Sequence, residues 1–252
     1  MKSDLGWSTA DRIVVQGHDL VDLIGTVSLG DFAFLELKGR LPTPEESTVF
    51  NSIAVTLVEH GMTPSAIAAR LTYFGAPESL QGAVAAGVLG MGSRFGGSIE
   101  EAARTLQEAL ATAGPDADLG EVARDVVAAY KKTKQPIAGL GHPIHKPIDP
   151  RTPRLFAIAL ENGLSGRYIE LMKLISNEAG RVYGRDLPVN ATGAIGAILS
   201  ELDFPWQMGR GLAVIARAIG LVAHIQEEIK EPLAAEIWSR VEDEASEHNR
   251  TD

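Results

Sequence analysis

The sequence of 252 residues contains no cysteine. Disulfide bonds, cysteine-ligated zinc sites and thiol nucleophiles are therefore excluded. The spacings of other well-defined sites are also missing: there is no HExxH pair, acidic calcium loop, GxSxG elbow, P-loop or GxGxxG after a strand. We expect no metal site in this chain.

Long apolar segments are scarce as well. No apolar run approaches the length of about 18–20 residues that a membrane span needs. The first twelve residues are polar and lack the apolar core of a secretory signal. The formal net charge of −10 disfavours a nucleic-acid partner, although a local basic pocket for an anionic ligand is compatible with it. We expect a cytoplasmic, soluble protein without a nucleic-acid or membrane partner.

Aromatic residues make up only 6% of the chain, whereas glycine occurs 26 times and alanine is abundant. Small side chains let helices approach closely, so this composition favours an all-α fold. Helical periodicity runs from Ser28 to Glu244, with starts such as Thr43-Pro44-Glu45-Glu46, where a Thr N-cap precedes Pro and acidic residues. The only strand material is residues 12–16, followed by a turn at 17–19, which predicts a short N-terminal β-hairpin.

The strongest local signal is the loop at residues 139–151, inside a segment with five prolines at 133–153. Gly139 and Gly141 allow a backbone to approach a ligand closely. His142, His145, Lys146 and Arg151 then follow within ten residues. Two imidazoles and two cations suit an anionic substrate and proton transfer near neutral pH. The alternative is a proline-rich surface loop with solvated charges.

Two glycine-containing turns lead into helices and could also meet a ligand. The turn at 92–98 carries Arg94 and Phe95, and its glycines could expose N–H groups to an anion or simply join two helices. In Pro188-Val189-Asn190-Ala191-Thr192-Gly193, Asn190 and Thr192 could hydrogen-bond a ligand, although helix capping is the simpler interpretation.

Two cationic side chains stand apart from these loops. Arg217 lies in the apolar stretch 212–225, where it is either paired with a glutamate or turned to a ligand, because an unpaired buried charge is costly. His60 follows the helix that Pro44 begins, at an end where the helix dipole favours a cation. His224 shares the helix face of Arg217 and is more often a satisfied core residue.

Taken in order, these segments resemble the citrate synthase superfamily over nearly the whole chain. Gly141-His142 with Asp149-Pro150-Arg151 is similar to its GH…DPR signature, and Arg94-Phe95-Gly96-Gly97 to the turn of citryl-CoA lyases and of the lyase module of ATP-citrate lyase. Further similarity lies in Glu59-His60-Gly61, in Asn190–Gly193, in residues 217–224 (RAIGLVAH) and in the early turn at 38–43 (KGRLPT).

The resemblance implies a helical homodimer, or a higher oligomer, that acts on an acyl-CoA. It implies a large lobe at 1–138 and 203–252 and a small closing lobe at 139–202. The reaction makes or breaks a carbon–carbon bond between a thioester α-carbon and a carbonyl carbon, with coenzyme A as part of the substrate and no tightly bound cofactor.

The resemblance also implies roles for individual side chains. The catalytic group would comprise His142, Asn190 and Thr192, with His142 on the oxo or hydroxyl oxygen. His60, Arg94, Phe95, Arg151 and Arg217 would bind the substrate. Gly139, Leu140, Gly141, His145 and Lys146 would bind CoA.

Three departures from the family pattern bear on the reaction. The family's general-base aspartate falls on Thr192, which cannot act as a carboxylate base at neutral pH. The histidine that synthases carry in the glycine-rich turn falls on Phe95, as in citryl-CoA lyases. Near the C-terminal end, Lys230-Glu231-Pro232 stands where the family has a further arginine.

Three functions follow as hypotheses. The first is a lyase that cleaves citryl-CoA or a related 3-hydroxyacyl-CoA to acetyl-CoA, or a similar thioester, and a carbonyl product. The second is a non-catalytic acyl-CoA or carboxylate-binding protein, favoured by Thr192. The third is a condensing enzyme of the synthase type, which Phe95 and the short chain disfavour. Fold alone does not choose among them.

Overall fold

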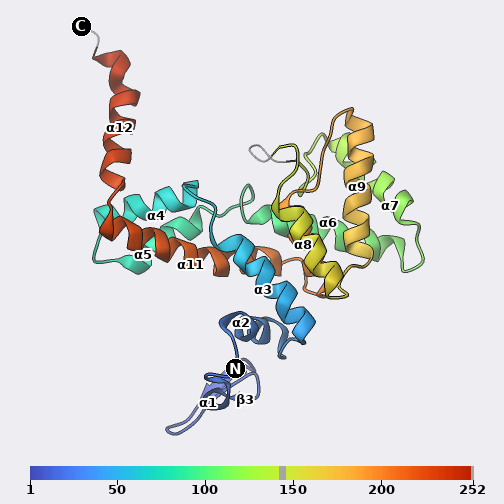
Figure 1. The fold of residues 1–252 in the computed structure, drawn as a ribbon, viewed down its shortest axis with the longest axis horizontal. Helices are drawn as coiled ribbons and strands as arrows, with labels where there is room; N and C mark the ends of the chain where they lie inside the picture. The colour runs from blue at the N-terminus through green and yellow to red at the C-terminus, as the bar shows by residue number, and fades with distance from the viewer. Residues whose placement is uncertain (142–145, 251–252) are drawn as a thin grey trace. The chain divides into compact units, whose positions relative to one another are not determined.

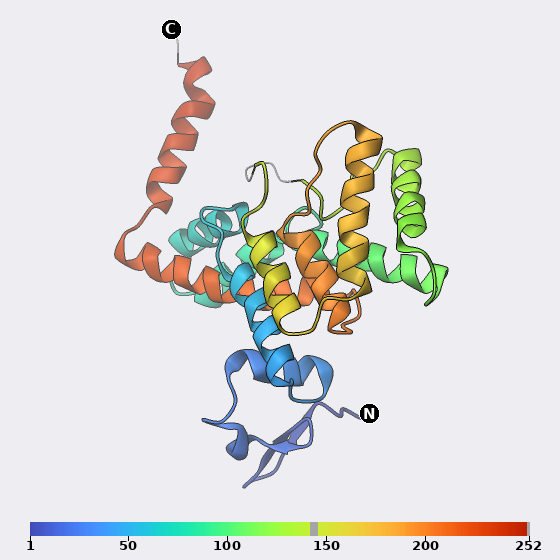
Figure 2. The same ribbon diagram turned by 45° about the vertical axis from the view of Figure 1, so that its right-hand side comes forward.

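The computed structural model describes residues 1–141 and 146–250, and helices dominate them (Figures 1 and 2). The helices are α1 (Leu20–Leu23), α2 (Leu29–Lys38), α3 (Pro44–Val58), α4 (Pro64–Gly75), α5 (Leu80–Leu89), α6 (Gly97–Ala113), α7 (Leu119–Thr133), α8 (Arg151–Glu161), α9 (Arg167–Tyr183), α10 (Ala191–Glu201), α11 (Met208–Lys230), α12 (Ala234–Ser246) and the 3-10 turn η1 (Glu247–Asn249). The predicted helical class is therefore confirmed.

The helix boundaries follow the capping residues in the sequence. Thr63 accepts a hydrogen bond from the backbone N–H of Ala66 at the start of α4, and Thr43 forms a reciprocal capping pair with Glu46 at the start of α3. Gly39 ends α2 in the left-handed conformation, at φ 71°. Capping chemistry thus sets these ends within a residue or two of the prediction.

The N-terminal strands extend beyond the predicted hairpin. β2 (Ile13–Val15) pairs antiparallel with β3 (His18–Asp19), which confirms a hairpin but places its second strand within the predicted turn. β1 (Gly6–Ser8) adds a third strand, with Trp7 opposite Val14. β1 escapes sequence analysis because three residues of Gly, Trp and Ser carry no alternating apolar pattern.

The chain divides into two compact units, residues 1–54 with 98–209 and residues 55–97 with 210–252. In the first unit α10 is the central helix, because its residues 193–200 are all buried. Phe34, Phe50 and Phe204 form a buried aromatic cluster, with ring centroids 5.3–5.7 Å apart. The division into a large lobe at 1–138 and 203–252 and a small lobe at 139–202 stays a prediction.

The second unit is built from α4, α5 and the C-terminal helices. α4 and α5 lie side by side, with α11 along them (Figure 1). α12 contacts α4, where the ring centroids of Trp238 and Phe74 are 6.4 Å apart.

α11 has 23 residues and a mean hydropathy of 1.4 over its most apolar window, of which 44% is buried. By length and composition α11 could cross a membrane, contrary to our expectation of no such run, although the core helix of a soluble protein meets the same criterion.

Candidate functional site

The glycine-rich loop and the segment before α10 lie against each other in the first unit. Asn190 donates its backbone N–H to the Gly139 carbonyl at 2.9 Å, and Gly141 donates to the Pro188 carbonyl at 2.7 Å. Between these two hydrogen bonds, Leu140 and Val189 form an isolated antiparallel β-bridge. The structure thus brings together two segments, 139–141 and 188–193, that the sequence marked separately.

Glycine is required where these segments cross. Gly139 has φ +89°, and a Cβ there would lie 2.6 Å from the Gly193 Cα. A Cβ on Gly193 would in turn lie 2.4 Å from the Gly139 carbonyl oxygen. Both the backbone conformation and the close approach exclude a side chain at Gly139.

Asn190 closes the N-terminus of α10. Its Oδ1 accepts hydrogen bonds from the backbone N–H groups of Thr192 and Gly193, and also from the Thr192 hydroxyl at 2.8 Å. Its Nδ2 donates to the Gly141 carbonyl. The capping interpretation of Asn190 is therefore confirmed, while the catalytic roles predicted for Asn190 and Thr192 remain predictions.

Asp149 joins the starts of two helices. Its carboxylate is 1% exposed and accepts four hydrogen bonds: Arg151 gives its backbone N–H at 3.1 Å, Nε at 3.0 Å and Nη2 at 2.8 Å, and Ala191 gives its backbone N–H at 3.0 Å. A negative charge at the N-termini of α8 and α10 is favourable because both helix dipoles are positive there. Burial raises the pKa of Asp149, but the Arg151 side chain and the two backbone N–H groups outweigh it and bring the pKa to about 2.

The same contacts define what Arg151 can offer a ligand. Its guanidinium is held by one edge, through Nε and Nη2, and its side chain keeps 28% of its exposure. Arg151 is thus oriented by Asp149, which is part of the Asp149-Pro150-Arg151 motif but is not among the site residues predicted from the sequence.

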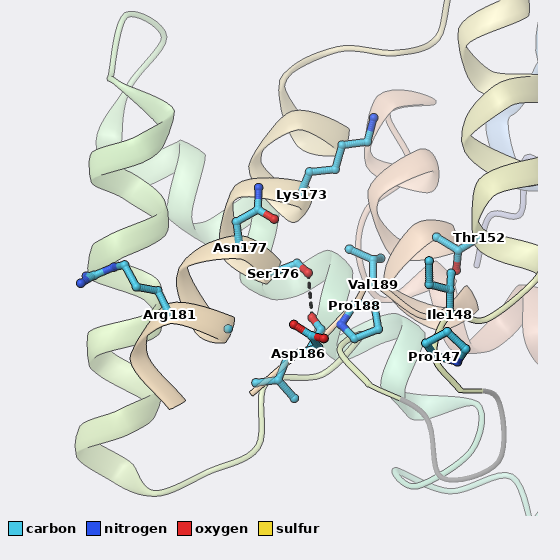
Figure 3. Close-up of a pocket in the computed structure, with 12 residues that line it drawn as sticks. Pro147, Ile148, Thr152, Lys173, Ser176, Asn177, Arg181, Asp186, Pro188 and Val189 are labelled. Carbon is cyan, nitrogen blue, oxygen red and sulfur yellow. Dashed lines mark hydrogen bonds between the residues drawn. The ribbon is translucent and has the colours of Figure 1, made fainter. Parts of the chain in front are cut away.

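A pocket of about 590 Å³ opens beside Asp149 and Arg151 in the first unit (Figure 3). Ile148 and Thr152, which flank Asp149 and Arg151, line it from one side, and the C-terminal half of α9 lines it from the other. Ser176 on α9 donates to the Leu187 carbonyl at 2.7 Å, which ties α9 to the segment before Asn190. Lys173, Asn177, Arg181 and Asp186 supply polar groups to the lining.

The sequence patterns predict none of these α9 side chains as site residues. They lie on the polar face of an amphipathic helix, where charged residues are normally only solvated. The one available signal was the adjacency of Asp186 and Leu187 to the marked segment at 188–193. Lys146, which was selected, is exposed and lies next to the lining residue Pro147.

The remaining predicted residues belong to the second unit or lie outside the described residues. His60 is half-buried in the turn after α3, Arg94 and Phe95 are exposed in the turn 92–97, and Arg217 is half-buried on α11. The Gly92 carbonyl accepts from the N–H groups of Phe95 and Gly97, so this turn is a closed backbone structure. His142 and His145 lie outside the described residues.

The described residues thus form a mostly helical protein in which a glycine-containing loop packs against a helix start and Asp149 holds Arg151 beside it. Comparison with known proteins identifies the family: residues 33–238 match the model "Citrate synthase, C-terminal domain". The chain therefore belongs to the citrate synthase family.

The solved structures that it resembles include citryl-CoA lyase from Hydrogenobacter thermophilus, with 39% identity and a TM-score of 0.84 over 92% of this chain and 88% of that one. ATP citrate lyase from Methanothrix soehngenii, solved with citrate and coenzyme A, has 22% identity and a TM-score of 0.77 over 91% of this chain and 39% of that chain, and supports the fold alone.

Among curated proteins, the ATP-citrate synthase beta chain protein 2 of Arabidopsis thaliana is 29% identical over 91% of this chain. A citrate synthase of Synechocystis is 26% identical over 87% of it. The chain spans 38% and 54% of the lengths of these two relatives.

The lowered pKa of Asp149 predicts that the free energy of unfolding depends on pH. Because its pKa falls from 3.8 to about 2 on folding, the ionised group stabilises the fold above pH 4, and this contribution is lost as the pH falls toward 2. It amounts to about 2 kcal/mol. We expect Asp149→Asn to lower the free energy of unfolding at pH 7 by at least that amount, and the difference from the wild type to shrink by about half at pH 3.

Urea unfolding followed by circular dichroism at a series of pH values measures this difference. Glu244→Gln is the matched control, since Glu244 also pairs with an arginine, Arg240, but both side chains are mostly exposed, and such surface pairs contribute little. A pH-independent penalty for Asp149→Asn would mean that the carboxylate is not ionised in this role.

Proposed function

We propose that the protein is an acyl-CoA carbon–carbon lyase of the citryl-CoA lyase type. The observation that carries this proposal is the likeness to the Hydrogenobacter thermophilus citryl-CoA lyase, which spans nearly the full length of both chains at 39% identity. A further solved relative is an ATP citrate lyase variant described in complex with (3S)-citryl-CoA. By this likeness the substrate is citryl-CoA or a related 3-hydroxyacyl-CoA, with coenzyme A as a part of the substrate that stays in the thioester product, and no separate cofactor.

The geometry of the first unit supports CoA binding. Hydrogen bonds between residues 139–141 and 188–193 fix the backbone directly before the sequence positions of His142, His145 and Lys146. The adjoining pocket of about 590 Å³ lies within the usual size of ligand sites and has Lys173 in its lining for an anionic group. We assign the CoA moiety to this loop and pocket.

In the proposed reaction the bond between the thioester α-carbon and the carbinol carbon breaks. His142 takes the proton of the substrate hydroxyl as the carbonyl forms, and the bond's electron pair passes to the thioester as an enolate, which is then protonated. By the same likeness, Arg151 in the first unit is proposed to pair with a substrate carboxylate, and bidentate arginine suits that task. His60, Arg94 and Arg217 in the second unit are proposed as substrate-binding residues on the resemblance alone. Phe95 is the neighbour of Arg94 in the glycine-rich turn.

Thr192 favours one competing function. Its hydroxyl donates to Asn190 within the helix cap, so no carboxylate stands at this position to move a proton on carbon. A non-catalytic acyl-CoA-binding protein needs no such group. A condensing enzyme forms the enolate by the reverse of the proton transfer that ends cleavage, so both reactions need a proton-transfer group at this carbon, and Thr192 does not distinguish between them.

The test of the proposed function is a panel of 3-hydroxyacyl-CoA thioesters, citryl-CoA included, assayed for the released thioester and carbonyl product. We expect turnover of at least one dicarboxylic or tricarboxylic member. Saturable binding of CoA thioesters by calorimetry, with no cleavage of any member, would instead support the binding protein.

His142 is the first residue to change. If it transfers the hydroxyl proton, His142→Ala and His142→Gln should each lower kcat by about 10²–10⁴-fold and leave the thermal midpoint almost unchanged. His248→Gln, in the C-terminal η1 turn, is the control and should keep full activity. A His142→Ala protein that is active but destabilised would refute the catalytic assignment.

We also propose that the protein is a homodimer and that it works in the cytoplasm. One stripe of α11, at spacings of four, three and seven residues, leaves Ile215, Ile219, Val222 and Ile229 between 43% and 58% exposed. Four large apolar side chains on one helix face are more than a monomer usually leaves to water. A second copy with the same stripe is a self-complementary partner.

The α11 stripe predicts the effect of a charge. Ile219→Glu should turn a dimer into a monomer in light scattering, because two buried carboxylates would face each other across the interface. Leu160→Glu, at a side chain on α8 that is 68% exposed, should leave the mass unchanged. A wild-type protein that is monomeric at micromolar concentration would contradict the dimer.

A further inference from the structure

Helix α4 of the second unit buries a complete charge. Arg70 is 0% exposed, and a buried guanidinium is tolerated only when its donors are paired. It pairs with Glu227 and, at 2.8 Å through Nη1, with Glu228. Both glutamates lie on α11, which Figure 1 shows alongside α4.

Arg70 also determines the tautomer of His224. Its Nε and Nη2 lie 3.3 and 3.1 Å from His224 Nδ1. Since a guanidinium has only donors, Nδ1 must accept, and the proton of a neutral imidazole is then on Nε2. That N–H faces the Glu59 carboxylate, at 3.2 Å from Oε1 and 3.1 Å from Oε2. The imidazole is thereby oriented from both sides.

The Glu59 carboxylate also accepts hydrogen bonds from the backbone of the turn that carries His60. Its Oε1 accepts the backbone N–H of His60 at 2.9 Å and the N–H of Gly61 at 2.5 Å. Gly61 has φ +71°, so the turn has a special conformation that needs such support. Gly220 lets α11 approach this turn, since a Cβ there would lie 2.0 Å from the Val58 carbonyl oxygen.

We propose that His224, oriented by Arg70, is a positioning residue that holds the His60 turn through Glu59. The proposal rests on the proposed function, in which His60 binds a substrate carboxylate. Glu228 extends the same network, since its other oxygen accepts the backbone N–H groups of Leu233 and Ala234 at the start of α12. A series of contacts thus runs from α12 through Arg70 and His224 to His60.

Two amide variants separate this role from simple packing. In His224→Gln the side-chain amide reaches about as far as Nε2 and can still donate to Glu59. In His224→Asn the amide ends near Nδ1 and cannot reach Glu59, although both variants remove one imidazole. We expect His224→Asn to raise the KM for citryl-CoA by about 10-fold, equivalent to about 1.4 kcal/mol, with kcat per folded molecule little changed. His224→Gln should stay within about twofold of the wild type.

Backbone amide exchange of His60 and Gly61 provides a second measurement that needs no substrate. Both amides should exchange slowly in the wild type and in His224→Gln, and faster in His224→Asn. Leu221→Ala is the control for stability, because Leu221 is fully buried on α11 and its side chain lies against Gly87 of α5. It should lower the thermal midpoint and leave the KM and these two amides unchanged.

The outcomes separate the two proposals. If the wild-type protein cleaves no citryl-CoA, the proposed function fails, and the exchange of the His60 and Gly61 amides still decides the positioning role. Equal exchange in the Asn and Gln variants, or a Leu221→Ala protein with the same loss of protection, would overturn the role of His224.

Discussion

The structure of the first unit depends on one buried carboxylate. Asp149 accepts the N–H groups that begin α8 and α10 and, at the same time, one edge of the Arg151 guanidinium. Such a charge could not be buried without these donors, since an unpaired carboxylate in the interior costs several kcal/mol. The orientation of Arg151 and the approach of the α8 and α10 N-termini are therefore consequences of the same interaction.

The contact between residues 139–141 and 188–193 depends on Asp149 as well. With the start of α10 held by Asp149, the segment at 188–193 lies where Gly139 and Gly141 can bond to it. The loop that carries His142 begins directly after Gly141. In the second unit the Arg70–His224–Glu59 series plays the equivalent part for the turn of His60. In both units, an ion pair with a buried partner holds a stretch of backbone next to a residue that the family resemblance predicts for the site, His142 or His60.

Local chemistry made much of the fold predictable. Thr43, Thr63 and the proline that follows each of them mark helix starts that the structure retains, and Asn190 caps α10 as its residue type indicates. Strand β1 was not predictable, because three residues show no period. The apolar character of α11 was underestimated, since its glycines and alanines dilute the stripe at Ile215, Ile219 and Val222.

The candidate site was predictable only in part. Motif residues such as Arg151 and Asn190 were found because their types and order carry information. The sequence does not predict that Asp149 joins two helix starts, since nothing in it shows that the Ala191 N–H donates to the Asp149 carboxylate. The same holds for Arg70 and Glu228, which are 158 residues apart and look like ordinary helix charges. Tertiary pairing between distant helices leaves no local signal.

The central claim is that the loop at 139–141, the segment at 188–193 and the adjoining pocket bind the CoA part of the substrate. Hydrogen–deuterium exchange of the full chain with and without coenzyme A tests it most directly. The account predicts slower exchange of the amides at 139–141 and 186–193 on addition of CoA, and no change in the strands β1 to β3. Protection confined to other segments, or absent at millimolar CoA, would contradict it.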